Sequence, residues 1–403
     1  MRIGVLTMPQ PLEGIRVLDL SQIYNGPYAT YLMAQAGADV IKVEPPGGEF
    51  LRKRDGRPGS SIPFTMLNGN KRSVSLNLKK AEGVRLFLQM VTSADVVLEN
   101  FAPGVMGRLG LDYNTLKAAN STIIMASGSG YGQAGQYRDY PAMDLTVQAM
   151  SGVMSTTGFT ENPPVKAGAA ICDFFGGIHL YGAVMTALLH RERHGEGSRI
   201  DVAMMDSVFP SMAANIGGVF GDIDNVPLRT GNQHGGLSLC PYNVYKAADG
   251  YIAILCNHDK HWDALLVAMD RQDLRAHPTY GSMKGRVDAM DVVDNLIEAW
   301  TLQHTRAVLF DRLIAERVPS APVRELTETL DDPHMHARGM LMKVDHPTHG
   351  EITICKSPLR FVDRPPPTWV MPPAYGEHNK QFFIDEVGLS ADDFAALESA
   401  GVV

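Results

Sequence analysis

The chain has few cysteines, and they lie far apart. The four cysteines, at positions 172, 240, 256 and 355, form no closely spaced pair of the kind found in disulfide frameworks or redox motifs. This usage is typical of a reducing compartment, so we expect a cytoplasmic protein. The sequence also lacks an uninterrupted apolar run of about 18 residues, the length that crosses a membrane. Its first residues lack the apolar segment of a signal peptide, and no membrane association is expected.

Basic residues are not in excess either. The 403 residues include 36 Lys and Arg against 44 Asp and Glu, a formal net charge of −8. Without a basic cluster we expect no nucleic-acid partner, and local groups have to hold any anionic ligand. Cys256, His258 and His261 lie close together, but no second ligand pair is near them. A structural zinc ion needs four ligands at defined spacing, so no metal site is expected.

The first half of the sequence alternates between strand and helix signals. Short β-rich runs occur at residues 15–20, 39–43, 95–98 and 122–126. Between and after them, apolar residues recur at helical spacing, at Val84, Phe87, Leu88 and Val91 and again from Phe174 to Leu188. Gly195 follows the second face, as glycine often does after a helix. The alternation predicts an α/β fold with a mostly parallel sheet covered by helices.

The pattern changes after Pro210. Residues 211–236 are rich in Gly and Asn and are interpreted as a linker and loop. A new unit follows, with a predicted strand at 251–255 and helices at 262–269, 292–300 and 307–316. The proline-rich stretch 357–378 should be extended, because proline disfavours helix. A short final helix is predicted at 379–387.

The motif GYGQAG, residues 130–135, matches the glycine pattern of dinucleotide-binding loops and follows a predicted strand. Such a site needs a helix that begins at the loop, so that backbone amides face the pyrophosphate. The next residues include Pro141 and show no helical periodicity. We therefore disfavour a nicotinamide- or flavin-dependent oxidoreductase. Nicotinamide or flavin cofactor bound to the purified protein would restore that hypothesis.

Asp173 is the most informative single residue. It follows the small residues 167–170 and precedes Gly176 and Gly177, at the start of the long predicted helix. One interpretation is a helix N-cap, for which Asp is a common residue, and local physics alone favours it. The other is a functional carboxylate in a pocket walled by small residues, which a substrate can approach closely.

Several long motifs occur in order along the chain. They include PLEGIRVLDLSQIYNGPYATYLMAQAGADVIKVEPP, LNGNKRSVSLNLKKAEG, DVVLENFAPGVMGRLGLDY, IIMASGSGYGQAG, MSTTGFTENPPVKAGAAICDFFGGIHL and GEGSRIDVAMMDSV. With these motifs, and GNQHGG further on, the chain resembles the class III CoA-transferase family. That family includes formyl-CoA:oxalate and carnitine CoA-transferases and the α-methylacyl-CoA racemases.

The resemblance implies a fold and an assembly. It implies a Rossmann-like large domain, a smaller α+β domain and a homodimer whose subunits interlock. On this basis we place the large CoA-binding domain at residues 1–215 and the small domain at 225–335. Residues 336–403 would form a C-terminal segment that returns to the large domain.

The resemblance also assigns roles. Asp173 matches the catalytic aspartate, which attacks the thioester and carries CoA through anhydride and aspartyl-CoA intermediates. The loop Gly231, Asn232, Gln233, His234, Gly235, Gly236 matches the mobile glycine loop, which would stabilise an oxyanion and exclude water. Arg229, Gln233 and His234 are candidates to hold a second carboxylate. The positions matching CoA contacts or the active-site rim are Gln22, Asn25, Leu76, Lys79, Asn100, Phe101, Arg108 and Tyr131.

The racemase branch of the family uses two bases, a histidine and an aspartate, on either side of the α-carbon. Met143 occupies the histidine position, and methionine cannot transfer a proton. The prediction is therefore an acyl-CoA:carboxylate CoA-transferase that moves CoA to a small carboxylic or dicarboxylic acid, with succinyl-CoA as a candidate donor. Coenzyme A enters as substrate, and no permanently bound cofactor is expected. A racemase and a non-catalytic CoA-binding protein are the alternatives.

Overall fold

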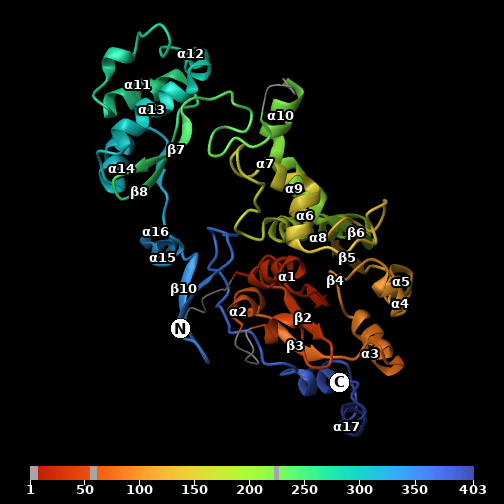
Figure 1. Ribbon diagram of the computed structural model, residues 1–403. Helices are drawn as coiled ribbons and strands as arrows, with labels where there is room; N and C mark the ends of the chain where they lie inside the picture. The colour runs from red at the N-terminus through yellow and green to blue at the C-terminus, as the bar shows by residue number, and fades with distance from the viewer. Residues whose placement is uncertain (1–7, 55–60, 222–226) are drawn as a thin grey trace. The chain divides into compact units, whose positions relative to one another are not determined.

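The computed structural model describes residues 8–54, 61–221 and 227–403, and the chain divides into two compact units (Figure 1). The first unit takes in the described residues up to Val147, together with Ala169–Val208 and Asp332–Val403. The second contains Gln148–Gly168 and the described residues of Phe209–Asp331. Residues 148–168 thus group with the second unit, although the sequence placed them in the large domain. They contact that unit directly, since Arg229 donates hydrogen bonds to the carbonyl oxygens of Phe159, Thr160 and Asn162.

The first unit is built on a six-stranded parallel sheet, which confirms the predicted α/β class. Its strands lie in the order β3-β2-β1-β4-β5-β6, and every neighbouring pair is parallel. The four predicted β-rich runs form β1 (Arg16–Asp19), β2 (Asp39–Glu44), β4 (Val96–Glu99) and β5 (Ile124–Ser129). The strands β3 (Arg72–Ser75) and β6 (Ser198–Ala203) complete the sheet.

Helices cover both faces of this sheet. On one face α1 (Asn25–Gln35) and α8 (Ile171–His194) enclose a core with Val17, Val96 and Leu98. On the other face α3 (Ala81–Val91) and α5 (Tyr113–Ala119) enclose a core with Leu18 and Val97. Adjacent strand residues point to opposite faces, so apolar runs in the strands supply both cores. The helix α8 is long and apolar enough to cross a membrane, a property that core helices of soluble proteins share. In this structure it packs on α1, β5 and β6.

The C-terminal residues pack against the second of these cores. After the hairpin of β10 (Leu341–His346) and β11 (Gly350–Cys355), the proline-rich stretch contains no helix or strand. The predicted final helix is the π-helical segment η4 (Gln381–Glu386), whose Phe382 and Phe383 are buried. A further helix, α17 (Ala391–Ser399), was not predicted, although Ser390 caps it by accepting from the N–H of Asp393. In Figure 1 these blue helices lie beside α3.

The second unit has an antiparallel sheet of β7 (Tyr242–Ala247), β8 (Gly250–Leu255) and β9 (Ser320–Pro322). Its core is shared with α11 (Asp259–Ala268), α13 (Met290–Thr301) and α14 (Arg306–Ala315), which match the three predicted helices. The predicted linker contains two helical segments instead of loop only, η2 (Phe209–Met212) and α10 (Ala213–Gly221). None of the α10 residues is buried, so this helix has no core-facing apolar stripe that a sequence pattern could reveal.

The remaining elements are short. In the first half they are η1 (Phe50–Lys53), α2 (Ile62–Asn68), α4 (Val105–Arg108), α6 (Asp144–Ser151), α7 (Val153–Thr156) and α9 (Met204–Val208). In the second half they are η3 (Gln272–Leu274), α12 (Met283–Asp288), α15 (Leu326–Leu330) and α16 (Pro333–Ala337).

Candidate active site

A pocket of about 480 Å³ opens between β1 and β4, where the strand order of the first unit's sheet reverses. From β1 the chain proceeds outward to β2 and β3, and from β4 it proceeds the other way to β5 and β6. The pocket is lined by residues that follow the carboxyl ends of β1, β4 and β5, the crevice in which open α/β sheets bind ligands. Seven of the sequence-predicted site residues line it together: Gln22, Asn25, Asn100, Phe101, Arg108, Tyr131 and Asp173.

Asp173 lies in the first turn of α8, and it is not the helix cap. The N-cap position is Ala170, which has no side chain to accept a hydrogen bond. Asp144, at the start of α6, takes that role: one carboxylate oxygen accepts from the N–H groups of Cys172 at 2.9 Å and Asp173 at 3.3 Å. The capping interpretation of Asp173 is therefore wrong. Because a distant carboxylate satisfies the helix end, the Asp173 carboxylate is left to the pocket.

The surroundings of Asp173 favour its neutral form. Burial raises the pKa of the Asp173 carboxyl to about 7 from an ordinary 3.8, and the negative charge of Asp144 contributes to the rise. A carboxylate with little water around it is a better nucleophile and binds protons more tightly. The side chain is therefore about half ionised near neutral pH, and it ionises more fully when a cationic or hydrogen-bonding group approaches.

Asn25 lines the pocket beside Asp173. Its side chain is 2% exposed, and its Nδ2 atom donates to the Asp173 carbonyl oxygen at 3.4 Å. It is packed so closely that a Cβ on Gly176 would lie 2.1 Å from Asn25 Nδ2, and one on Gly128 2.6 Å from Oδ1. Oδ1 is buried and has no hydrogen-bond partner in the part of the chain that the structure describes. A buried acceptor without a partner at a pocket wall is suited to an N–H or O–H group of a ligand.

The loop after β1 is held in a strained conformation. Ile23 has a φ of +66°, the left-handed region that β-branched residues rarely adopt. Two contacts hold it: Gln22 and Asn100 exchange hydrogen bonds of 2.8 Å through backbone and side-chain groups, and Ile23 N–H donates to Glu49 Oε2 at 3.0 Å. Strained backbone of this kind occurs at functional sites, where surrounding structure enforces it. Sequence reasoning missed Glu49.

A cluster of buried charged residues contacts the same loop. Asp19, fully buried at the end of β1, forms an ion pair with Lys71 at 3.0 Å and accepts from Thr30 Oγ1 at 2.8 Å. Lys42 Nζ donates to the Ser21 carbonyl oxygen at 2.9 Å. Buried charges are tolerated when they are paired and hydrogen-bonded, as these are. The cluster fixes the backbone that carries Gln22 and Asn25 into the pocket.

Two of the predicted CoA-contact residues do not line the pocket. Leu76 is 1% exposed and belongs to the core between the sheet and α3. Lys79 lies on the exposed turn that precedes α3, where its N–H donates to Asn77 Oδ1. An apolar residue at the end of a buried strand packs into the core by default, which explains Leu76.

The glycine loop 231–236 belongs to the second unit and has partners there. Gln233 Nε2 donates to Asp294 Oδ2 at 3.0 Å, and His234 Nδ1 accepts from the Gly236 N–H at 3.3 Å. Gly231 has a φ of +61°, and a Cβ there would lie 2.6 Å from the Phe159 ring. The guanidinium of Arg229, a candidate for binding a carboxylate, donates instead to the backbone carbonyl oxygens of residues 159, 160 and 162.

The comparison with known proteins decides the family. The model of CoA-transferase family III matches residues 12–379. The chain belongs to this family. It is therefore an enzyme, like the CoA-transferases that resemble it. A formyl-CoA:oxalate CoA-transferase of Streptomyces coelicolor is 35% identical over 97% of this chain and 99% of its own length. A succinyl-CoA:mesaconate CoA-transferase of Haloarcula marismortui is 38% identical over 94% and 96%.

Solved structures agree with the family assignment. A CAIB/BAIF family protein from Brucella suis superimposes with a TM-score of 0.81 at 31% identity, over 94% of this chain and all of its own. The likeness covers both units of the chain. The resemblance read from the sequence motifs is thus confirmed at the level of the family.

Proposed function

We propose that this family III CoA-transferase moves CoA from an acyl-CoA to a small carboxylic or dicarboxylic acid, with Asp173 as the nucleophile. The observation that carries the proposal is the position of Asp173: it is a half-buried carboxylate that does not cap its helix, and it lines the pocket where the strand order of the sheet reverses. The strand order of the six-stranded sheet supports a Rossmann-like large domain, in which such a crevice binds nucleotide-like ligands.

The exchange takes place in four balanced steps. The Asp173 carboxylate attacks the thioester carbonyl of the donor, and CoA leaves as a thiolate, which gives an acyl–aspartyl anhydride. The thiolate attacks the aspartyl carbonyl, which releases the donor acid and leaves aspartyl-CoA thioester. The acceptor carboxylate then attacks this thioester and expels the thiolate again. Attack of the thiolate on the acceptor's acyl carbonyl yields the new acyl-CoA and restores Asp173.

The pocket residues suit CoA as the shared substrate. The unpaired Oδ1 of Asn25 is an acceptor for an amide N–H, and the CoA arm carries such groups. Arg108 and Arg138 line the same pocket and supply positive charge for phosphate groups. Tyr131 lies at its rim with Tyr137 and Tyr140 in edge and tilted contacts, an aromatic surface for a base. Leu76 and Lys79 are not part of this proposed contact set.

The lid is proposed from the family resemblance, which assigns it to the loop 231–236. This loop has glycine at three of six positions and backbone N–H groups that can donate to an oxyanion. Closure over an anhydride would keep out the water that hydrolyses it. The hydrogen bond from Gln233 to Asp294 holds the middle of the loop.

Transfer is favoured over racemisation by the lining of the pocket. Met143 lines it together with Asp173, and no histidine is among the described residues that do so. Racemisation needs a second group that exchanges a proton, and a thioether has none. Succinyl-CoA is the proposed donor because it is named for the Haloarcula relative. A dicarboxylic acceptor is proposed because both named relatives act on one, oxalate or mesaconate.

We further propose a cytoplasmic homodimer that binds neither membranes nor nucleic acid. The outer face of α8 is apolar and exposed, at Phe175, Ile178 and Leu189, and a second copy would cover it. A stable monomer by multi-angle light scattering would contradict the dimer.

One incubation tests the proposed reaction. Purified protein in D₂O receives succinyl-CoA, a 2-methylacyl-CoA and a pool of small carboxylic acids, and acyl-CoA species are read by mass spectrometry with Asp173→Ala alongside. New acyl-CoA masses that vanish in the variant are expected, and they identify the acceptor. Deuterium at the α-carbon without new acyl-CoA species would instead indicate a racemase. Undiminished transfer by Asp173→Ala would refute the nucleophile.

A further inference from the structure

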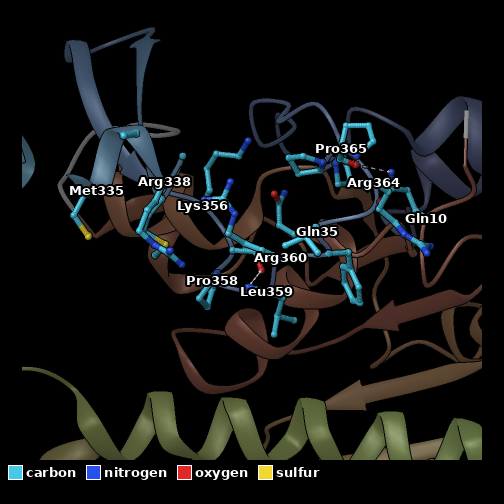
Figure 2. Close-up of a pocket in the computed structure, with 18 residues that line it drawn as sticks. Gln10, Gln35, Met335, Arg338, Lys356, Pro358, Leu359, Arg360, Arg364 and Pro365 are labelled. Carbon is cyan, nitrogen blue, oxygen red and sulfur yellow. Dashed lines mark hydrogen bonds between the residues drawn. The ribbon is translucent and has the colours of Figure 1, made fainter. Parts of the chain in front are cut away.

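A second cavity in the first unit, of about 960 Å³, shares no lining residue with the pocket of Asp173. Its walls are the end of α16, the residues that follow β11 and the proline-rich stretch, with Gln35 of α1 near the middle and Gln10 at the end away from Met335 (Figure 2). Nothing in the proposed transfer reaction uses it. Its volume lies at the upper end of the range for small-molecule sites, about 300–1,000 Å³.

The charge of this cavity is one-sided. Four cationic side chains line it, Arg338, Lys356, Arg360 and Arg364, and none of its lining residues is acidic. The whole chain carries −8, so the cavity has the opposite sign to the protein. Figure 2 shows Arg338, Lys356 and Arg360 grouped toward one end, with Arg364 near Gln10 at the other.

Three of these cations have no carboxylate partner. Arg364 is paired with Asp363 at 2.8 Å and donates to the Pro9 carbonyl oxygen at 2.9 Å. No carboxylate of the described residues lies within 4.0 Å of Arg338, Lys356 or Arg360. Elsewhere in the same unit, Arg16, Arg52 and Arg72 each have one. Unpaired like charges around one cavity repel each other, and a bound anion removes that repulsion.

The backbone that carries the cations is held in place. Lys356 N–H donates to the Met340 carbonyl oxygen at 2.7 Å, and Tyr31 Oη donates to the Cys355 carbonyl oxygen at 3.1 Å. At the other end Gln10 Nε2 donates to the Pro365 carbonyl oxygen at 3.1 Å. Prolines at 358 and 365–367 restrict φ through the stretch. A site whose backbone is already fixed loses less entropy when it binds a ligand.

The lining also has an apolar part. Leu359 and Phe361 are 38% and 44% exposed, and the Arg364 guanidinium carbon lies 5.8 Å from the centre of the Phe361 ring. An exposed aromatic ring beside cations suits a ligand that combines a flat ring system with several negative charges. Single carboxylates would leave most of the positive charge uncompensated, whereas a diphosphate brings several negative charges at once.

We propose that this cavity binds a nucleoside diphosphate or triphosphate, with the phosphates at Arg338, Lys356 and Arg360 and the base toward Phe361. The site is separate from the acyl-CoA pocket and needs no acyl group. The enzyme would thus have a second nucleotide-type site on its first unit.

Calorimetric titration of the full-length protein with ADP at low ionic strength tests the proposal. The double variant Lys356→Met/Arg360→Met removes two charges and keeps much of the side-chain length; we expect its affinity for ADP to fall at least about tenfold, since charge-assisted hydrogen bonds are lost. The control Arg193→Met removes an exposed arginine from the end of α8 and should leave the affinity unchanged. Circular dichroism checks folding, and each single variant is titrated in case the double variant misfolds.

Two further arms separate the alternatives. ADP is also a fragment of CoA, so binding of ADP in the acyl-CoA pocket is a separate component of the titration. Arg108→Met removes a cation from that pocket and should weaken only this component, leaving intact the one that the double variant weakens. Loss of all ADP binding in Arg108→Met, with none lost in the double variant, would place ADP in the acyl-CoA pocket and overturn the proposal. Pyrophosphate should bind more weakly than ADP, and adenosine more weakly still. Equal affinity for pyrophosphate and ADP would refute the nucleoside part, and no measurable binding of either would refute the site.

Discussion

Replacing Asp173 by asparagine should stabilise the folded protein while it abolishes CoA transfer. The pKa of the Asp173 carboxyl is about 7 in the folded protein and 3.8 when burial and Asp144 are absent. Each pH unit of difference corresponds to about 1.36 kcal/mol, so ionising Asp173 in its pocket costs at most about 4 kcal/mol. The side chain retains some contact with solvent, and we expect about half of that, roughly 2 kcal/mol, as the gain in unfolding free energy.

The gain has a defined pH dependence. Because the folded-state pKa is raised, the stability that the protonated carboxyl contributes is complete below pH 3.8. It is lost between 3.8 and about 7, as the unfolded chain ionises and the folded one does not. The difference in unfolding free energy between the Asp173→Asn variant and wild type should therefore be small just above pH 3.8, grow as the pH rises, and stay constant above pH 7.

Urea unfolding at pH 5, 6, 7 and 8, followed by circular dichroism, measures this difference. Asp385→Asn is the matched control, since Asp385 is exposed on the same unit and its variant should show the same stability as wild type at every pH. A constant difference between Asp173→Asn and wild type from pH 5 to pH 8 would refute the reasoning, because it would mean that Asp173 ionises normally. A destabilised variant at pH 8 would refute it as well.

Three other predictions each concern a single residue of the first unit. In rapid-quench experiments the rate of acyl transfer to the enzyme should rise about tenfold per pH unit up to pH 7, the pKa of Asp173. Asp144→Asn should lower the pH at which this rise ends by less than half of the difference between 7 and 3.8, because burial is the larger cause of the raised pKa. A rise that ends at the same pH in Asp144→Asn would contradict the role of Asp144. Gly176→Ala should lower the unfolding free energy by about 1–3 kcal/mol and raise the KM for acyl-CoA, because its Cβ would lie 2.1 Å from Asn25 Nδ2. The control is Gly182→Ala, whose Cβ would have nothing within 4 Å, and it should change neither value in the same denaturation and kinetic assays. Glu99→Gln should raise the unfolding free energy at pH 8 but not at pH 4.5, since burial raises the pKa of Glu99 to about 7. Equal gains in unfolding free energy at both pH values would show that the raised pKa of Glu99 is not their cause.

The sequence was sufficient to predict the elements whose signals are local. Parallel strands buried on both faces produce continuous apolar runs, and these located β1, β2, β4 and β5. An amphipathic helix such as α3 is visible from spacing alone. By contrast, α10 has no buried face, and its glycines and asparagine resemble a loop. The helix α17 was missed although the Ser390 cap and Asp393 form a recognisable start.

Most residues carried over from matching motifs lie together in one pocket, whereas those whose positions depend on packing lie elsewhere, and the roles of all of them stay predictions. Six of the eight predicted binding residues meet in one pocket, because the ends of β1, β4 and β5 meet at one edge of the sheet. Leu76 and Lys79 do not, since their places depend on how the turn before α3 packs. Glu49 was missed because its role depends on the φ of Ile23, 26 residues away in sequence. No local pattern records such a contact.

The two interpretations of Asp173 competed because a helix N-cap and a nucleophile need opposite things from a carboxylate. A capping carboxylate accepts backbone N–H groups, which stabilises its charge, lowers its pKa and occupies its lone pairs. A nucleophile needs those lone pairs free and its charge weakly solvated. Asp144 resolves the conflict by accepting from the Cys172 and Asp173 N–H groups. The same charge then contributes to the raised pKa of Asp173, so one residue both leaves the Asp173 carboxylate free of helix capping and makes it more basic. Loss of the Asp144 charge should therefore affect reactivity more than folding, provided that the substituted side chain can still accept the two hydrogen bonds.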